Sequence, residues 1–523
     1  MYLNPRIPDP DTVIAGKTVA LPHSSFPYQG SQALPPFCTS DVPTEFMQDW
    51  IPTTPLENMA QTNYDVLIIG SGAGGGAVLW RLCEHWKKSG KKIGIVEAGK
   101  ASLDTHVRNI ATMDAERVNK YFANPIISKP IGDFLPQFRG ARLFTALGGR
   151  TLFWGAICPR MHASELADWP VMPQEMEYYY DIAEEVMNVS SYYTQGSSFT
   201  EVLLSRIRRR GYPEAIDIPI AVDLERTRYG EVHSNVFFSS IVFLGRALNL
   251  LPYDLAVNTR AIKIITEQGA VSGVKVMSPD RKIYDLKAKT VVVSASALET
   301  PRLLLYSGIP GRAIGHYLTN HSSAEVSSTI GRGQFPENLG NLGILIPYSN
   351  VRSYQIQIQS DFWHQYQEIP LREELQISMT GFGAVEPRYE NKVSLDPVRR
   401  DEYGLPQLRV DFSYSEKDRS VIRQMADGFI HAAEALGTRL VTKNGVPDIC
   451  MRLPGRTYHD SGTCRMGDDP LTSVTNRYGQ IHGVPGLYVA DNSVLPSSGA
   501  ANPTLSTVAL AIRTADYIAS TLR

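Results

Sequence analysis

The sequence has few cysteines and no excess of charge of either sign. Its 523 residues include five cysteines, widely spaced and without the CxxC pairs or histidine clusters that bind zinc or build a disulfide scaffold. We therefore expect reduced thiols and no metal site. Because the 51 basic and 53 acidic residues are interspersed, the chain lacks the basic footprint of a protein that binds nucleic acid or an anionic membrane.

Long apolar segments are also missing. No run of roughly 18 apolar residues occurs, so we expect no membrane span. Before residue 62 there is neither the basic region nor the apolar region of a secretory signal, which predicts a cytoplasmic protein. Residues 1–61 are polar and proline-rich but contain aromatic side chains, and we expect them to form an ordered N-terminal extension.

A glycine-rich turn lies in the setting of a nucleotide-binding fold. Residues 70–75, with the sequence Gly-Ser-Gly-Ala-Gly-Gly, follow a strand-like apolar run at residues 64–69 and precede a segment of helical composition. Gly70 permits the tight turn, Gly72 allows close approach of a pyrophosphate, and Gly75 allows helix and strand to pack. The helix N-terminus then offers amides to the phosphate charge, as in a dinucleotide site.

A second strand carries an acidic residue at its end. Residues 93–96 form a short apolar strand, and Glu97 follows it, 22 residues beyond Gly75. A carboxylate at this distance is the expected partner of a ribose 2′-hydroxyl, and it disfavours a 2′-phosphate. These features predict nucleotide binding, with a nucleotide-free α/β unit as the alternative.

The next part of the chain contains a further glycine turn and several short strands. Paired glycines in residues 146–156 allow the backbone to lie against a flat ligand, although an ordinary loop is the alternative. Strands predicted at residues 256–265, 273–277 and 287–293 lead into a helix that we expect to start near Pro301. This segment predicts a return of the chain to the nucleotide-binding sheet.

A second sheet is predicted further along. Residues 330–413 alternate polar and apolar side chains, which is typical of an antiparallel sheet with one polar face, and such a sheet could roof a substrate cavity. Polar candidates for that cavity are Gln355, Gln357, Gln359 and Arg388. Alternating glutamines are more often the solvated face of a strand, so we expect these glutamines to face water.

Six motifs follow one another along the chain: Gly70 to Gly75, Glu97-Ala98-Gly99, Gly148-Gly149, Thr300-Pro301-Arg302-Leu303-Leu304, His459 to Gly467 and Asn502-Pro503-Thr504. Through these motifs, over roughly residues 62–523, the chain resembles the glucose-methanol-choline (GMC) family of FAD-dependent oxidoreductases. Residues 386–392, 401–406 and 499–505 look most like the pyranose oxidase and C-glycoside oxidase branch.

The resemblance implies an α/β fold with two domains. A discontinuous Rossmann-like FAD-binding domain would adjoin an α+β substrate-binding domain built on an antiparallel sheet. The expected segments are residues 62–160, 225–320 and 455–523 for FAD, and residues 161–224 and 321–454 for the substrate.

The resemblance assigns catalysis to His459 and Asn502. The imidazole, with an ordinary pKa of about 6.5, would take the proton of an alcohol hydroxyl, and the Asn502 amide would donate to the same oxygen. In isolation, such residues are more commonly a surface or capping histidine, here beside Asp460, and a turn residue, here before Pro503.

The resemblance also predicts the cofactor site. The expected FAD contacts are Gly70, Gly72, Ala73, Gly74, Gly75, Glu97, Ala98, Gly149, Thr151, Trp154, Gly155, Ala156, Ala261, Asp491, Asn502, Pro503 and Thr504. Members that bind flavin covalently carry a histidine where this chain has Phe153, so we expect noncovalent FAD. Many relatives have glycine at Ser296, where we expect a local backbone adjustment without loss of the cofactor.

The predicted reaction is oxidation of a secondary hydroxyl of a sugar or glycoside to a ketone, with hydride passing to flavin N5 and the proton to His459. The alternatives are an oxidase or dehydrogenase for a nonsugar alcohol, such as a sterol, terpenoid or natural-product intermediate, and an FAD-containing lyase. Either O₂ or a quinone or protein acceptor would reoxidise the flavin, and the oligomeric state is left open.

Overall fold

The computed structural model describes residues 49–131, 137–224, 236–335, 339–360 and 373–522. The chain divides into two compact units, Met1–Trp50 and Ile51–Arg523, and every element below belongs to the second. The N-terminal extension lies outside the described residues up to residue 48, so its order stays a prediction, as do the domain boundaries.

A mixed seven-stranded sheet forms the core of the region that is predicted to bind the nucleotide. The strand order is β10-β11-β12-β1-β2-β9, and β23 also pairs with β12. The strands are β1 (Asn63–Ile69), β2 (Ile93–Val96), β9 (Asp254–Ala256), β10 (Arg260–Glu267), β11 (Ala270–Met277), β12 (Ile283–Val293) and β23 (Leu487–Val489). All neighbours among β23, β12, β1, β2 and β9 are parallel, whereas β10 and β11 are antiparallel.

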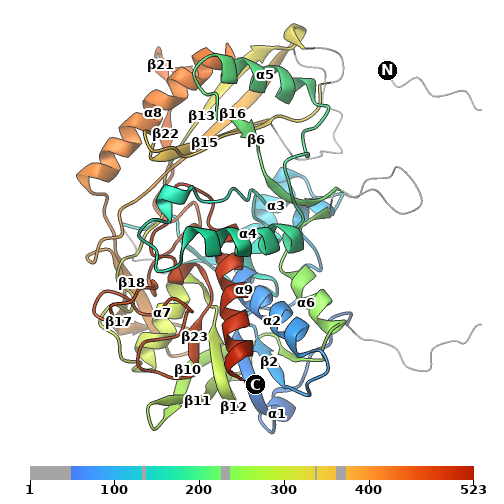
Figure 1. Ribbon diagram of the computed structural model, residues 1–523, viewed down its shortest axis with the longest axis vertical. Coiled ribbons are helices and arrows are strands. Elements are labelled where there is room, and N and C mark those ends of the chain that lie inside the picture. The colour runs from blue at the N-terminus through green and yellow to red at the C-terminus, as the bar shows by residue number, and fades with distance from the viewer. Residues whose placement is uncertain (1–48, 132–136, 225–235, 336–338, 361–372, 523) are drawn as a thin grey trace, which may run out of the picture. The chain divides into compact units, whose positions relative to one another are not determined.

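Helices from distant parts of the chain cover this sheet. The helices of the described residues are α1 (Leu56–Met59), α2 (Ala73–Trp86), α3 (Ala115–Phe122), α4 (Pro173–Met187), α5 (Ser198–Arg209), α6 (Ile241–Leu248), α7 (Ser296–Tyr306), α8 (Glu416–Leu436) and α9 (Thr504–Thr521). Of these, α5 and α8 pack on the second sheet described below. In Figure 1, α2 (blue) lies beside α9 (red), and α6 packs on α2. Because β1 is buried from Tyr64 to Ile69, its near-continuous apolar sequence is that of a central parallel strand.

A second seven-stranded sheet is antiparallel and includes three strands of the predicted region 330–413; residues 392–411 of that region form a separate two-stranded sheet. The order of the seven-stranded sheet is β19-β13-β16-β15-β14-β6, with β22 paired to β13. The strands are β6 (Ile216–Asp217), β13 (Ser322–Gly331), β14 (Gly343–Ile346), β15 (Tyr354–Gln359), β16 (Glu374–Gly383), β19 (Arg439–Leu440) and β22 (Cys450–Met451). Ile356 and Ile358 of β15 join one apolar core with Phe429 of α8 and Leu203 of α5. The predicted α/β fold with an antiparallel sheet is therefore confirmed.

Smaller strand pairs complete the unit. They are β3 (Ser128–Pro130) with β4 (Arg142–Phe144), β5 (Val189–Ser190) with β7 (Ile220–Asp223) and β8 (Val236–Phe237), β17 (Lys392–Arg400) with β18 (Pro406–Asp411), and β20 (Thr442–Lys443) with β21 (Val446–Pro447). Among the described residues, no helix is both long and apolar enough to cross a bilayer. Cys83, Cys158, Cys450 and Cys464 are free thiols.

Two predicted boundaries are wrong. The helix expected to start near Pro301 starts at Ser296, so Pro301 lies inside α7 and cannot donate to the Ala297 carbonyl. The Thr463 hydroxyl donates to that carbonyl instead, at 2.6 Å, which explains why the proline is tolerated. The strand expected at residues 256–265 is two strands, because Asn258 has a φ of +51° and turns the chain between β9 and β10.

Candidate active site

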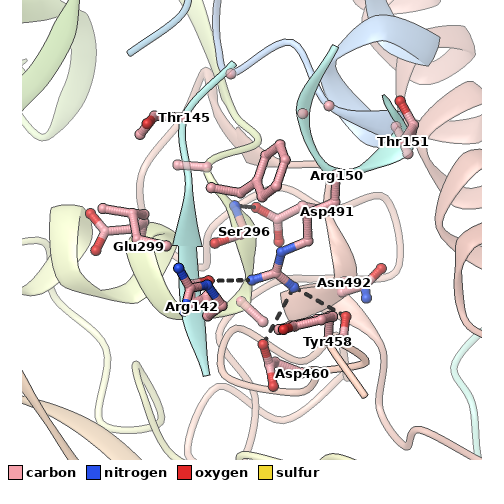
Figure 2. Close-up of a pocket in the computed structure, with 18 of the residues that line it drawn as sticks. Arg142, Thr145, Arg150, Thr151, Ser296, Glu299, Tyr458, Asp460, Asp491 and Asn492 are labelled. Atoms are coloured by element: carbon pink, nitrogen blue, oxygen red, sulfur yellow. Dashed lines mark hydrogen bonds and ion pairs between the residues drawn. The ribbon is translucent and has the colours of Figure 1, made fainter. Parts of the chain in front are cut away.

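A cavity of about 970 Å³ opens at the carboxyl ends of the parallel strands. Its wall includes the residues that follow β1, β2 and β12, which is the edge where open α/β sheets bind ligands. Residues 457–460 and 491–492, which follow in the C-terminal part of the chain, also line it. Figure 2 shows part of this wall, with Arg150 directed at Tyr458 and Asp460.

The glycine turn after β1 has room for no other residue at three of its positions. Gly70 has a φ of +97°, and a Cβ there would lie 2.3 Å from a neighbouring carbonyl oxygen. A Cβ on Gly74 would lie 1.7 Å from the Ala490 carbonyl oxygen, and one on Gly75 would lie 1.9 Å from that of Gly70. Gly72 precedes α2 and has open space where a Cβ would stand, so a ligand can approach its backbone from the cavity.

Glu97 is buried and accepts three hydrogen bonds. Its Oε2 accepts from the Ser71 N–H at 3.0 Å and from the Ser71 hydroxyl at 2.7 Å, and its Oε1 accepts from the Gly99 N–H at 2.8 Å. A carboxylate has about four acceptor positions. One position therefore remains for a ligand hydroxyl in the cavity that Glu97 lines.

The second glycine turn lies against the first. The Gly148 N–H donates to the Ser71 hydroxyl at 3.0 Å, and a Cβ on Gly149 would lie 2.9 Å from the Gly72 Cα. The Thr151 hydroxyl donates to the Gly148 carbonyl at 2.6 Å and fixes the turn. The two turns, separated by more than seventy residues, form one wall of the cavity.

Asp491, which lines the cavity, connects the segment after β23 with the first turns of α7. Its Oδ2 accepts from the Ser296 N–H at 2.9 Å and from the Thr300 hydroxyl at 2.5 Å, and its Oδ1 accepts from the Ser493 N–H at 2.8 Å. Figure 2 shows the bond to Ser296. Ser296 has a φ of +89°, a left-handed backbone conformation that favours glycine, the residue expected here in many relatives. Burial raises the pKa of Asp491.

Most of the predicted cofactor contacts line this one cavity. Those that do are Gly70, Gly72, Ala73, Gly74, Glu97, Ala98, Gly149, Thr151, Trp154, Gly155, Ala261, Asp491, Asn502 and Thr504. Gly75, Ala156 and Pro503 are buried outside its lining. The lining fits a dinucleotide such as FAD in three respects: the backbone of Gly72 can be approached, Glu97 has one acceptor position left, and α2 presents its N-terminal amides.

Phe153 lines the cavity at the position where covalent members carry histidine. Its ring lies 5.7 Å from that of Phe122 and 5.4 Å from that of Phe144, so it belongs to an aromatic cluster. Because a phenyl ring cannot bond to flavin, noncovalent binding stays our prediction.

The loop that carries His459 is held on both sides. Arg150 Nη1 donates to the Tyr458 carbonyl at 3.1 Å and pairs with the Asp460 carboxylate at 3.4 Å (Figure 2). Asp460 is 1% exposed and also accepts from the Asn320 amide at 2.7 Å. These contacts fix the backbone on either side of the imidazole.

His459 lines the cavity and contacts a second histidine, which sequence reasoning missed. Its Nδ1 lies 2.8 Å from Nδ1 of His321, and its Nε2 has no hydrogen bond to any residue that the structure describes. Burial, followed by electrostatic interaction with His321, Arg452 and Arg150, holds the pKa of His459 well below its ordinary value. Nothing local marks His321, because the two histidines are 138 residues apart.

Asn502 is oriented by two glutamines of β15. Gln355 and Gln357, 1% and 3% exposed, donate from Nε2 to the Asn502 Oδ1 at 2.9 and 2.6 Å. The prediction that these glutamines face water is wrong, because the Asn502 segment covers the polar face of the strand. Gln359 is partly exposed, and Arg388 donates to Ser413; neither lines the cavity.

The fold and the cavity together define a dinucleotide-dependent enzyme in which a histidine and an amide face the cofactor space. Models of the GMC oxidoreductase family match residues 64–323 and 387–511. The chain belongs to this family, and it is an FAD-dependent oxidoreductase that acts on alcohol groups.

Relatives agree with this assignment. The chain is 30% identical to a C-glycoside 3-oxidase from Arthrobacter globiformis, over 73% of this chain and 75% of that protein. It is 27% identical to a 2-methyl-1,2-propanediol dehydrogenase from Mycolicibacterium austroafricanum, over 87% and 95% of the two chains. The fold is similar to that of a formate oxidase from Aspergillus oryzae RIB40, with a TM-score of 0.64, 14% identity, and 88% and 98% of the chains covered. The expected resemblance to the C-glycoside oxidase branch is confirmed by the first of these.

Proposed function

We propose that the protein oxidises a secondary hydroxyl of a sugar or glycoside to a ketone, with FAD as hydride acceptor and His459 as base. The observation that carries the proposal is that His459 and Asn502 line the same cavity as the predicted FAD contacts. A hydroxyl group can donate one hydrogen bond to the imidazole and accept another from the amide.

His459 is suited to take the hydroxyl proton. Hydride leaves an alcohol carbon more easily once the oxygen has lost its proton, so a neutral base beside the reacting carbon accelerates the reaction. The lowered pKa of His459 keeps its imidazole neutral at pH 7. A positioned general base contributes about 10²- to 10⁴-fold in rate.

Asn502 holds the oxygen without competing for its proton. Since Oδ1 accepts from both Gln355 and Gln357, the Nδ2 of Asn502 is the group left to donate toward the substrate. An amide N–H that donates to a developing alkoxide stabilises negative charge where it forms.

The chain's other residues would hold the cofactor. Bound FAD supplies the hydride acceptor at flavin N5. The glycine turn and the N-terminus of α2 would hold the diphosphate, Glu97 the adenosine ribose, and Asp491 the region of the diphosphate and ribityl chain.

A glycoside is the preferred substrate because the relative from Arthrobacter is a C-glycoside 3-oxidase. The dehydrogenase from Mycolicibacterium acts, by its name, on a small diol, and supports a nonsugar alcohol as the second candidate. Both substrates present a hydroxyl to the same two side chains.

Anaerobic flavin reduction tests the proposal. The purified protein is mixed with monosaccharides, O- and C-glycosides and nonsugar diols, and the flavin absorbance near roughly 450 nm is followed. We expect bleaching with a sugar or glycoside, and a ketone product. Bleaching by nonsugar alcohols alone would exclude the sugar proposal and support the second candidate. Admission of air or of a quinone to the reduced protein then identifies the electron acceptor.

A matched pair of variants tests the base. His459→Ala should slow flavin reduction by about 10²- to 10⁴-fold. His482→Ala is the control, because His482 contacts the Ser473 hydroxyl at 3.0 Å and does not line the cavity. Equal rates for the two variants would remove His459 from the mechanism.

A further inference from the structure

His321 is a buried histidine that contacts His459 from outside the cavity lining. It directly precedes β13, is 1% exposed, and lies 2.8 Å, Nδ1 to Nδ1, from His459. We propose that His321 is a positioning residue that decides which ring nitrogen of His459 carries the proton, so that the Nε2 lone pair faces the cavity. The inference rests on the proposed function, because it gives the base of that reaction its correct tautomer.

The first step is the contact of His321 with the backbone. Its Nε2 lies 3.2 Å from the carbonyl oxygen of Ser498, which is fully buried. A carbonyl oxygen only accepts hydrogen bonds, so the Nε2 of His321 must carry hydrogen and donate.

The proton position on His321 then decides the proton position on His459. A neutral imidazole has one donor nitrogen and one acceptor nitrogen, so the Nδ1 of His321 is the acceptor. The facing Nδ1 of His459 must then carry hydrogen and donate across the 2.8 Å contact. The Nε2 of His459 is left without hydrogen, and this is the nitrogen that has no partner among the described residues.

The surroundings keep His321 neutral, as this chain of bonds requires. Burial lowers the pKa of His321 to about 4. The Phe382 ring of β16 packs 5.7 Å from the His321 ring, and the cations Arg452 and Arg150 lower the pKa of the neighbouring His459. A protonated His321 would donate from both nitrogens and turn the Nε2 of His459 into a donor, which would abolish its action as a base.

The same hydrogen bond is kept after proton transfer, when His459 is an imidazolium. When the substrate O–H bond breaks, its proton forms an N–H bond at the His459 Nε2, and the hydride leaves the carbon for the flavin. The His459 imidazolium keeps its Nδ1–H bond to the neutral acceptor nitrogen of His321. The proton therefore needs no rearrangement of either ring.

Two substitutions separate positioning from simple packing. In His321→Gln the side-chain oxygen can accept from His459 while the amide N–H donates to Ser498, so both hydrogen bonds keep their direction. His321→Leu fills the space but forms neither hydrogen bond. We expect the Gln variant to reduce its flavin within a few-fold of wild type and the Leu variant to be slower by about 10²-fold or more in the limiting rate, with little change in the substrate concentration at half-saturation.

A control variant tests the loss of a histidine from the same segment. His316 lies five residues earlier, stacks on Tyr389 at 3.7 Å and does not line the cavity. His316→Leu should reduce its flavin at the wild-type rate. Equal rates for His321→Leu and wild type, or failure of the Gln variant to recover activity in a folded, flavin-loaded protein, would overturn the inference.

Nitrogen-15 NMR of histidine-labelled protein gives a readout that does not need turnover. The His459 signals, assigned by their loss in His459→Asn, should show hydrogen on Nδ1 and none on Nε2, in both wild type and His321→Gln. Hydrogen on Nε2 in wild type would refute the inference even if His321→Leu does not fold. A wild-type protein whose flavin no alcohol reduces would contradict the proposed function, whereas the tautomer measured by NMR would still decide the role of His321.

Discussion

The two glutamines behind Asn502 offer a graded test of the site. Gln355 and Gln357 donate to one oxygen, the Asn502 Oδ1, at 2.9 and 2.6 Å, and both are almost fully buried. Methionine is the closest apolar match in length and shape, so Gln355→Met and Gln357→Met remove each donor with little change in packing.

The expected loss in the rate of flavin reduction depends on how many hydrogen bonds to the Asn502 Oδ1 remain. One hydrogen bond contributes about 1 kcal/mol net, so each single variant should slow flavin reduction by about 5-fold. With both donors removed, the amide is free to rotate and present its oxygen to the substrate. The double variant should then approach Asn502→Ala, whose loss of a donor to the developing alkoxide costs about 10²- to 10³-fold.

Rapid anaerobic mixing with the best substrate measures these rates. Gln359→Met is the matched control, because Gln359 lies on the same strand but is partly exposed and does not line the cavity. Adding Asn502→Ala to the double variant should cause no further loss, since the three residues act as one unit. A double variant with the wild-type rate, or a control as slow as the single variants, would refute this account of Asn502.

Three further predictions concern the cofactor, stability and pH. Gly74→Ala should purify without its yellow colour, because the added Cβ would lie 1.7 Å from the Ala490 carbonyl oxygen, whereas Gly333→Ala, with open space around it, should keep a full flavin spectrum. Ser296→Gly should raise the free energy of unfolding by about 1 kcal/mol, because glycine relieves the cost of a φ of +89°; denaturant melts measure this, and no gain, or an equal gain in Ser296→Ala, would contradict it. The rate of flavin reduction should stay level as the pH falls to about 6.5, because the lowered pKa of His459 keeps the base neutral there, and should decline only in more acid solution; a decline centred at about pH 6.5 or above would show that the pKa of His459 is not lowered.

The parts of the fold that the sequence predicted are local. Strand β1, the glycine turn and α2 follow one another within 24 residues. The reasons for Gly70 and Gly75 are local, because Gly70 has a φ of +97° and a Cβ on Gly75 would lie 1.9 Å from the Gly70 carbonyl oxygen. The cavity wall around Gly72 and Glu97 was therefore within reach of sequence reasoning.

The parts that the sequence did not predict depend on partners far along the chain. Alternation showed that β15 has a polar face, but only the fold shows that Asn502, some 147 residues from Gln355, covers it. In the same way, Pro301 looked like the start of a helix, because the Thr463 hydroxyl that satisfies the carbonyl before it lies 166 residues away from Ala297.

The divided edge of β12 has a consequence for how the protein is made. One edge of this strand pairs with β11 through residues 283–287 and with β23 through residues 291–293, and β23 comes from near the C-terminus. A ribosome must therefore translate past residue 489 before the central sheet can close. A chain that terminates early would leave the β12 edge and one face of α2 open to other chains, which favours aggregation. A chain that ends before β23 would also lack Asp491 and Asn502, which we propose contact the cofactor, so we expect it to purify without yellow colour.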